Sequence, residues 1–203
     1  MTLAVPNKGR LVEPTLRLLH DAGLVFEEHD RSLVARVQNF DLDILFVRTN
    51  DVIEFVGDGV ADLGVTGIDL LSESGVDLPR IRTLGYGQCR LAAAVPADTP
   101  HQAVEDLAGL RVATAHPNTA RRFFAERQIP VEVVPISGAV EVAQHQRADA
   151  ERIAAADHLL GRQRHQRERT FDLPHRLDET RVDVLLAARR DQVQDRLGVG
   201  GGG

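Results

Sequence analysis

Lysine is almost absent from this chain of 203 residues. Lys8 is the only one, although lysine and arginine together number 24. A compact ammonium and a planar guanidinium are not interchangeable where a charge must point at one oxygen. A single lysine among so many arginines therefore indicates a phosphate-facing position. The alternative is that Lys8 is a surface lysine that has not been replaced by arginine, by chance. Lys8 lies between a short apolar run and a helix-like run, in the turn Asn7-Lys8-Gly9-Arg10.

Three further absences concern the compartment. Cys89 is the only cysteine, so the chain cannot form an internal disulfide, which fits a reducing compartment. No apolar run approaches the roughly 20 residues of a membrane-spanning helix. The N-terminal residues lack the charged-then-apolar pattern of a signal peptide. We therefore expect a soluble cytoplasmic protein that does not associate with membranes.

Aromatic residues and excess positive charge are also scarce. Tryptophan is absent and aromatics make up 4% of the chain, so we expect a core of Val, Leu, Ile and Ala. The hydrophobic content of 43% is enough for one large or two small domains. The net charge is −6 and no basic patch dominates the first two-thirds, which argues against a nucleic-acid binder. A small anionic ligand remains compatible with local cationic pockets.

Short apolar runs alternate with helical patterns along the first third of the chain. This alternation predicts an α/β layer with parallel strands. The predicted strands are 2–5, 43–47 and 62–66, and the predicted helices are 11–19, 52–56 and 68–72.

Two extended runs, 80–86 and 90–95, follow almost without a break and predict a crossing between two lobes. The first lobe is expected to span residues 1–90 and to be completed by a C-terminal segment at about 181–197. The second lobe is expected at 91–180, and the Gly-rich residues 198–203 are expected to be disordered. Predicted elements of the second lobe are helices 104–107, 119–126 and 139–143 and strands 111–114 and 131–135.

Three turns of the first lobe follow strands at their carboxyl ends, where α/β sheets bind ligands. Lys8-Gly9-Arg10 follows the first strand, Arg48 the second, and Gly67 with Asp69 the third. Helix N-termini at these turns favour anions. Taken singly, Arg48 is also compatible with a surface charge and Asp69 with a helix N-terminal acid. Their convergence predicts an anion site.

Polar turns recur in the second lobe at 114–119 and 137–141. Helix caps of Ser, Thr and Asn explain such turns equally well. His116 precedes a proline and fits a loop residue better than a general base. Cys89 is either a small packed residue or part of a ligand-lining surface between the lobes. No His/Cys cluster has metal-site spacing, and no Ser/His/Asp arrangement stands out.

Taken together, five stretches resemble the ATP phosphoribosyltransferase family, which catalyses the first step of histidine biosynthesis. They occur in the family's order and spacing and cover about residues 1–143. The length resembles the short form, which lacks a C-terminal regulatory domain. The stretches are LAVPNKGRL (3–11), DILFVRTNDVIEFVGDGVADLGVTGIDLL (43–71), GYGQCRLAAAVP (85–96), RVATAHP (111–117) and SGAVEVA (137–143).

The resemblance implies a two-lobed fold like the type II periplasmic binding proteins, with the active site in the cleft. It implies transfer of the phosphoribosyl group of phosphoribosyl pyrophosphate to N1 of ATP with Mg²⁺, and a regulatory partner similar to histidyl-tRNA synthetase in a hetero-oligomer. It assigns no catalytic residue and no definite metal ligand, although Glu141 is a candidate for Mg²⁺. The residues that it places in the substrate-binding cleft are Lys8, Gly9, Arg10, Arg48, Asp69, Cys89, Arg90, Ser137, Gly138 and Glu141.

The chain departs from the family after Ala143. The family continues with a proline, an Asp-rich strand and a Thr-Gly-x-Thr loop that holds the 5′-phosphate of the phosphoribosyl substrate. Residues 144–169 are instead rich in Gln, His, Arg and Asp, and no buried-strand pattern is visible before Val182. Such a composition is typical of a GC-rich gene read out of frame, so we hypothesise a frame change near codon 143. Translating the other frames tests it, because an Asp…Thr-Gly-x-Thr pattern must then appear.

Two other functions remain open at this point. The chain is also compatible with a cytoplasmic small-anion-binding module of the same fold. Without the phosphate loop it is equally compatible with a catalytically impaired remnant, whose second lobe lacks a core strand and a helix.

Overall fold

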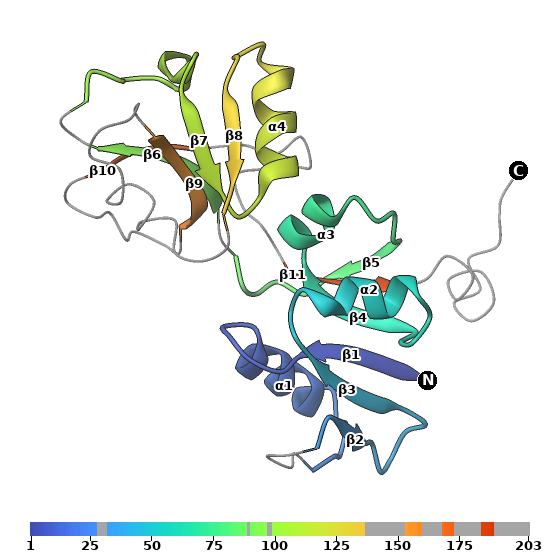
Figure 1. Cartoon of the computed structure of the whole chain (residues 1–203). Helices are drawn as coiled ribbons and strands as arrows, with labels where there is room; N and C mark the ends of the chain where they lie inside the picture. The colour runs from blue at the N-terminus through green and yellow to red at the C-terminus, as the bar shows by residue number, and fades with distance from the viewer. Residues whose placement is uncertain are drawn as a thin grey trace, which may run out of the picture. The chain divides into compact units, whose positions relative to one another are not determined.

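A computed structural model describes residues 1–27, 32–88, 90–96 and 99–136, together with three later strands at 153–159, 168–172 and 184–188. The chain forms two compact units (Figure 1). The first comprises Met1–Gly87 and Asp183–Gly203, and the second comprises Gln88–Val182. The first unit is therefore made of two segments that are distant in sequence. The helix predicted at 139–143 and the tail at 198–203 lie outside the described residues.

The first unit is built on a six-stranded sheet with the order β2-β3-β1-β4-β11-β5. Strands β1, β3 and β4 run parallel, whereas β2 and β11 run antiparallel to their neighbours. The parallel strands predicted at 2–5, 43–47 and 62–66 are therefore confirmed, and β2 and β11 add antiparallel neighbours on either side of them. The strands are β1 (Thr2–Pro6), β2 (Val34–Arg36), β3 (Asp43–Val47), β4 (Leu63–Gly67), β5 (Arg80–Thr83) and β11 (Val184–Ala188).

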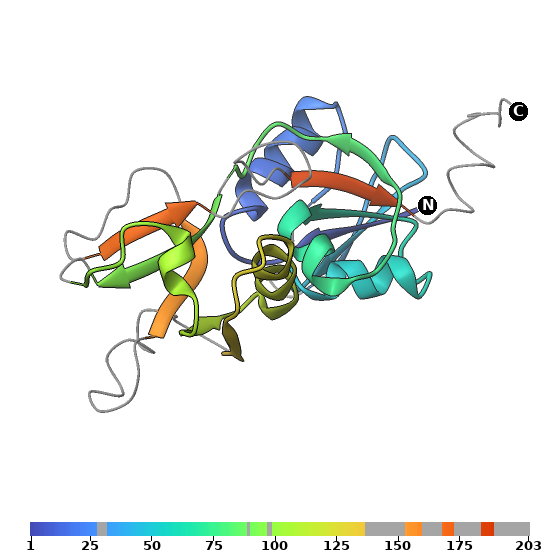
Figure 2. The ribbon, with the colours of Figure 1, turned by 90° about the horizontal axis from the view of Figure 1, so that it is seen from above.

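Helices cover both faces of this sheet, as Figure 2 shows. Leu3 and Val5 of β1 pack in one cluster with Leu11 and Leu19 of the α1 region, whereas Ala4 packs with Val52 and Val56 of α2 on the opposite face. This alternation follows from the two-residue period of a strand. The helices are α1 (Val12–Asp21), α2 (Asp51–Gly57) and α3 (Ile68–Ser74).

The second unit has a five-stranded sheet with the order β10-β6-β9-β7-β8. Helix α4 (Pro117–Glu126) packs against this sheet through Phe123 and Phe124. The two rings are arranged edge to face, with 5.1 Å between their centroids. The core is thus mainly aliphatic, as expected, but α4 adds two phenylalanines. The other elements are β6 (Arg90–Pro96), a 3₁₀ turn (Val104–Leu107), β7 (Arg111–Thr114), β8 (Glu132–Pro135), β9 (Ile153–Leu159) and β10 (Glu168–Asp172).

Strands β9 and β10 correct the sequence interpretation. No buried-strand pattern was expected between residues 144 and 182, and under the alternative of an impaired remnant the second lobe was expected to lack a core strand. Instead β9 lies between β6 and β7, antiparallel to the first and parallel to the second, and β10 pairs with the other side of β6. The backbone of β9 thus completes the centre of the sheet despite its Ala-rich sequence.

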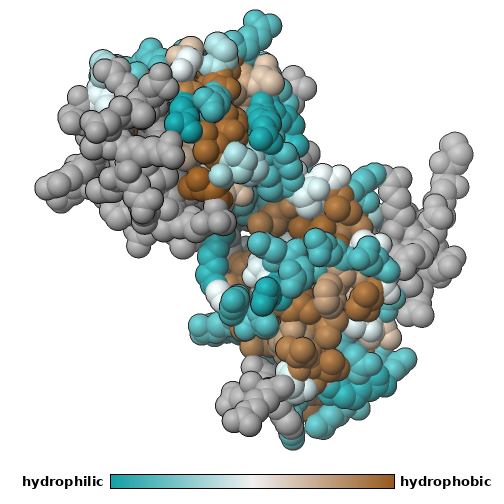
Figure 3. Space-filling model, viewed as in Figure 1, coloured by the Kyte–Doolittle hydropathy of each residue, from teal (hydrophilic) through white to brown (hydrophobic). Residues whose placement is uncertain are grey.

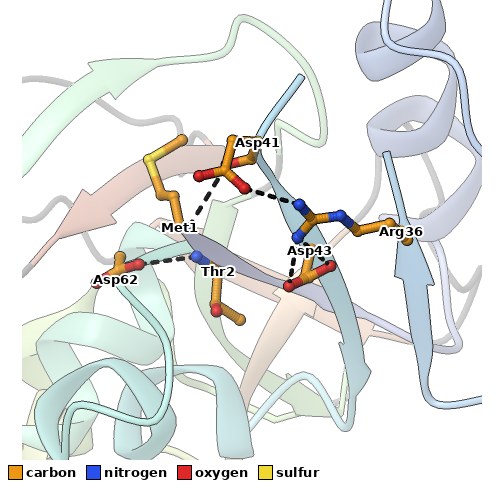
Figure 4. Close-up of polar contacts among 6 residues, drawn as sticks. All are labelled: Met1, Thr2, Arg36, Asp41, Asp43 and Asp62. Atoms are coloured by element: carbon orange, nitrogen blue, oxygen red, sulfur yellow. Dashed lines mark hydrogen bonds and ion pairs between the residues drawn. The ribbon is translucent and has the colours of Figure 1, made fainter. Parts of the chain in front are cut away.

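Polar contacts stabilise the amino ends of the parallel strands (Figure 4). The backbone N–H of Thr2 donates to Asp62 Oδ2 at 2.7 Å. The Arg36 guanidinium donates to Asp43 at 3.0 Å and to Asp41 at 2.7 Å. Three acidic residues at this edge therefore hold neighbouring segments together, which identifies a structural role for them.

Replacing Asp62 with alanine should destabilise the first unit by about 1–2 kcal/mol, because the Thr2 N–H loses its acceptor in a partly buried position. The urea midpoint of unfolding measures the loss. Asp62→Asn is the matched control, since its amide oxygen still accepts, and it should lose less than half as much. Equal losses in the two variants would contradict this role of the Asp62 oxygen.

Exposed large apolar side chains in the first unit come from several segments of the chain between residues 18 and 76. Figure 3 shows apolar and polar residues interspersed on the visible face of this unit. Among the described helices, none combines the length and the apolar character that a membrane crossing requires. The exposed side chains are Leu18, Val25, Leu33, Val34, Phe40, Val60 and Val76.

Candidate functional site

The carboxyl ends of β3, β1 and β4 lie next to one another in the first unit, because these strands are neighbours and parallel. Pro6 at the end of β1 lies opposite Val47 at the end of β3. The N–H of Asn7 then donates to the Val47 carbonyl oxygen at 2.7 Å. This bond places the turn that carries Lys8 directly beside the start of the turn that carries Arg48.

The turn between β1 and α1 exposes its two cations. Lys8 and Arg10 are exposed, and Gly9 between them has φ +89°, a left-handed conformation that favours glycine. The N–H of Val12 donates to the Gly9 carbonyl oxygen at 3.3 Å and closes the turn. Arg48 is also exposed, one residue beyond β3. Three exposed cationic residues therefore lie in two neighbouring turns at one edge of the sheet, an arrangement suited to phosphate oxygens.

Asp69 lies at the same edge, in the first turn of α3, and is 9% exposed. Its carboxylate occupies the place where a side chain on Gly67 would begin, so a larger residue at 67 would require Asp69 to move. A carboxylate in a first helical turn is favoured by the free N–H groups there. The position of Asp69 thus supports its reading as a helix N-terminal acid, and it also brings a buried negative charge to the edge that holds Lys8 and Arg48.

A second polar edge forms in the second unit, where the chain leaves β7 for α4. The N–H of His116 donates to Thr114 Oγ1 at 2.9 Å, and the N–H of Ile136 donates to the Thr114 carbonyl oxygen at 3.0 Å. His116 is 7% exposed and precedes the first residue of α4. Arg90 pairs with Leu159 at the carboxyl end of β9, which runs parallel to β7. The start of β6 and the Thr114 turn therefore share one edge.

Several predicted site residues cannot be placed. Four of them, Cys89, Ser137, Gly138 and Glu141, lie outside the described residues. For Arg90 the structure gives the strand and its register but not the side chain. The structure thus groups Lys8, Gly9, Arg10, Arg48 and Asp69 within the first unit and places Arg90 in the second.

Sequence reasoning missed one buried polar contact in the first unit, between Thr15 and Tyr86. Their oxygens are 2.7 Å apart. Burial raises the pKa of Tyr86, and the hydrogen bond with Thr15 partly opposes this. The sequence contains only part of the signal: Thr15 falls on the i, i+4, i+8 stripe with Leu11 and Leu19, which predicts that Thr15 is buried but does not identify Tyr86 as its neighbour.

The described residues do not form a preformed metal site. No group of three His, Cys, Asp or Glu side chains gathers among them in a way that could hold a metal ion. At the cationic edge of the first unit, Asp69 is the only predicted site residue with a carboxylate. One carboxylate is too few for an all-protein Mg²⁺ site, although Mg²⁺ often binds through substrate phosphates and one or two carboxylates.

Comparison with solved structures shows the fold. The ATP phosphoribosyl transferase (HisG:HisZ) complex from Thermotoga maritima contains a chain that superimposes with a TM-score of 0.74 at 23% identity, over 98% of this chain and 92% of that one. The periplasmic aliphatic sulphonate binding protein SsuA from Escherichia coli matches with a TM-score of 0.55 at 15% identity, over 96% of this chain and 62% of that one. The expected two-lobed fold class, like that of the periplasmic binding proteins, is confirmed.

Sequence comparison shows the family. The family model described as ATP phosphoribosyltransferase matches residues 48–154. A relative of that name from Gemmatimonas aurantiaca is 49% identical over 150 residues, which cover 71% of this chain and 51% of the relative. A relative of the same name from Halorubrum lacusprofundi is 39% identical over 214 residues, which cover 93% of this chain and 71% of the relative. The chain spans about half the length of most of the curated relatives that it matches first. The chain belongs to the ATP phosphoribosyltransferase family.

Proposed function

We propose that this chain transfers the phosphoribosyl group of phosphoribosyl pyrophosphate to N1 of ATP, giving phosphoribosyl-ATP and pyrophosphate in the first step of histidine biosynthesis. Identity of 39–49% to proteins named ATP phosphoribosyltransferase is the observation that carries the proposal. The cationic edge formed by Lys8, Arg10 and Arg48 supports it, because both substrates are rich in phosphate. The cytoplasm is the compartment proposed for this reaction.

The chemistry asks for positioning and charge stabilisation more than for proton transfer. A bond forms between adenine N1 and C1 of the ribose, while the bond from C1 to the pyrophosphate oxygen breaks and its electron pair leaves with pyrophosphate. Negative charge then builds on the leaving oxygens, where Lys8, Arg10 and Arg48 are suited to stabilise it. The mechanism needs no strong general base, which agrees with the lack of an obvious one in the sequence.

Mg²⁺ is proposed as the cofactor, and the chain is assigned no ligand for it. The ion would supply further stabilisation of charge on the pyrophosphate. Because Mg²⁺ retains several waters and commonly binds through phosphates, an ion brought in by the substrate does not need a cluster of protein carboxylates.

A regulatory partner similar to histidyl-tRNA synthetase is part of the proposal, and the complex would be a hetero-oligomer. The fold similarity to a chain of the HisG:HisZ complex from Thermotoga maritima supports it.

Pyrophosphate release tests the proposed reaction. The purified chain should release pyrophosphate only when ATP, phosphoribosyl pyrophosphate and Mg²⁺ are all present, and EDTA should abolish the release. The measurement is made with and without the regulatory partner. Binding of phosphate compounds without any release would favour the small-anion-binding module, to which the similarity with SsuA also points. Co-purification with the regulatory partner without turnover would identify a catalytically impaired remnant.

A further inference from the structure

A chain of two hydrogen bonds joins the end of the first segment of unit 1 to the start of α1. Thr15 Oγ1 lies 2.6 Å from the Leu11 carbonyl oxygen and 2.7 Å from Tyr86 Oη. The Leu11 carbonyl oxygen only accepts, and a threonine hydroxyl has a single proton. Thr15 therefore donates to Leu11, and Tyr86 must donate to Thr15.

The packing of both side chains fixes this geometry. Thr15 is 1% exposed, and the half-buried Tyr86 packs against the cluster that includes Leu3, Val5 and Leu11. Tyr86 stands between Gly85 at φ +76° and Gly87 at φ +70°. The backbone therefore turns on both sides of the Tyr86 ring. Residues other than glycine rarely adopt such left-handed φ values. Packing and the hydrogen bond with Thr15 therefore anchor the Tyr86 ring within this segment.

The chain of hydrogen bonds ends at the cationic turn. Leu11 directly follows Arg10 and precedes the first residue of α1, and its carbonyl oxygen also accepts the Thr15 N–H at 3.1 Å. At the other end, Gly87 closes the first segment of unit 1, and the polypeptide enters the second unit at Gln88. The hydroxyl of Tyr86 thus connects the exit from unit 1 with the residue next to Lys8-Gly9-Arg10.

We propose that Tyr86 is a positioning residue that holds the Lys8–Arg10 turn in place through Thr15. Its loss uncouples the segment 84–87 from the first turn of α1 and leaves both freer to move. The effect on substrate rests on the proposed function, whereas the coupling of the two segments does not.

Amide hydrogen exchange tests the coupling in the full-length chain without substrate. Tyr86→Phe should speed exchange about threefold to tenfold, both at residues 11–15 and at 84–87, as expected for the loss of one hydrogen bond. It should also speed acetylation of Lys8 by acetic anhydride, which is read at a single peptide because the chain has no other lysine. Ser74→Ala is the control, since Ser74 donates to the Leu71 carbonyl oxygen at 2.8 Å in α3 of the same unit. Faster exchange confined to 84–87, or an equal effect of Ser74→Ala at 11–15, would overturn the proposal.

Variants of Thr15 test the order of the hydrogen bonds. Thr15→Val should reproduce the exchange pattern of Tyr86→Phe, the double variant should add little, and Thr15→Ser should retain the wild-type pattern. In the pyrophosphate assay, Tyr86→Phe should raise the KM for one of the phosphate substrates about threefold to tenfold with little change in kcat. A fall in kcat at constant KM would contradict a role in binding. If neither the wild type nor any variant releases pyrophosphate, the proposed function is wrong. The hydrogen-exchange data still test whether segments 11–15 and 84–87 are coupled.

Discussion

Lys8→Arg is expected to lower kcat/KM in the pyrophosphate assay by about tenfold to a hundredfold, the range of one lost charge-assisted hydrogen bond. Lys8 lies in the exposed turn beside Arg48, where an ammonium can approach one phosphate oxygen closely. A guanidinium retains the charge, but it is larger and planar and prefers a two-oxygen contact. Retention of the positive charge alone should therefore not preserve activity.

The control for Lys8→Arg is Arg17→Lys. Arg17 is exposed on α1, in the element that follows the Lys8 turn, and does not belong to the predicted site. The substitution Arg17→Lys should change kcat/KM by no more than about twofold, because an isolated surface charge contributes little to stability or binding. Equal and small effects of both substitutions would mean that Lys8 is a surface residue retained by chance.

Gly64→Ala is expected to destabilise the first unit by about 1–3 kcal/mol, the usual cost of forcing a methyl group into a packed core. A Cβ at residue 64 would lie 2.7 Å from methyl groups of both Val52 and Val56, which are 1% and 0% exposed. The strand cannot easily shift away, since β4 pairs with β1 on one side and β11 on the other. The urea midpoint of unfolding measures the effect.

Gly57→Ala is the control for Gly64→Ala. A Cβ at residue 57 would meet only a methyl group of Val76, at 3.7 Å, which is an ordinary contact. Because Gly57 is the last residue of α2, Gly57→Ala should leave the stability unchanged or raise it by up to about 1 kcal/mol. Combining Gly64→Ala with Val52→Ala should cost less than the sum of the two single changes, because the second makes room for the first. Strict additivity would contradict the proposed overlap.

Local sequence patterns predicted the first-unit strands and helices well where apolar residues recur with a clear period. Strands β1, β3 and β4 differ by at most one residue at each end from the predicted ranges. Strand β2 was missed because it has three residues and only Ala35 is buried. The antiparallel direction of β11 depends on how the chain returns from the second unit, and no local pattern contains that information.

Strand β9 shows why the later part of the chain was harder to interpret. Its sequence, IAAADHL, is rich in alanine, which favours helices and is depleted in strands. Its strand conformation comes from the two neighbours, β6 and β7, between which it pairs. The hypothesis of a frame change near codon 143 is a separate question, which the nucleotide sequence decides.

The candidate site was predictable as far as strand ends determine it. Lys8, Arg48 and Asp69 follow three strands whose parallel direction brings their carboxyl ends to one edge. The contact between Thr15 and Tyr86 joins residues 71 positions apart, so no motif or spacing could relate them.

The position of β11 also has a consequence for synthesis on the ribosome. Among the described strands, β5 is attached to its sheet through β11 alone, and β11 separates it from β4. Until residues 184–188 emerge, β4 presents an unpaired edge while the whole second unit is being translated. Such an edge invites pairing with other chains, and contacts so distant in sequence form slowly. Nascent chains arrested before residue 184 should therefore be the forms most dependent on chaperones.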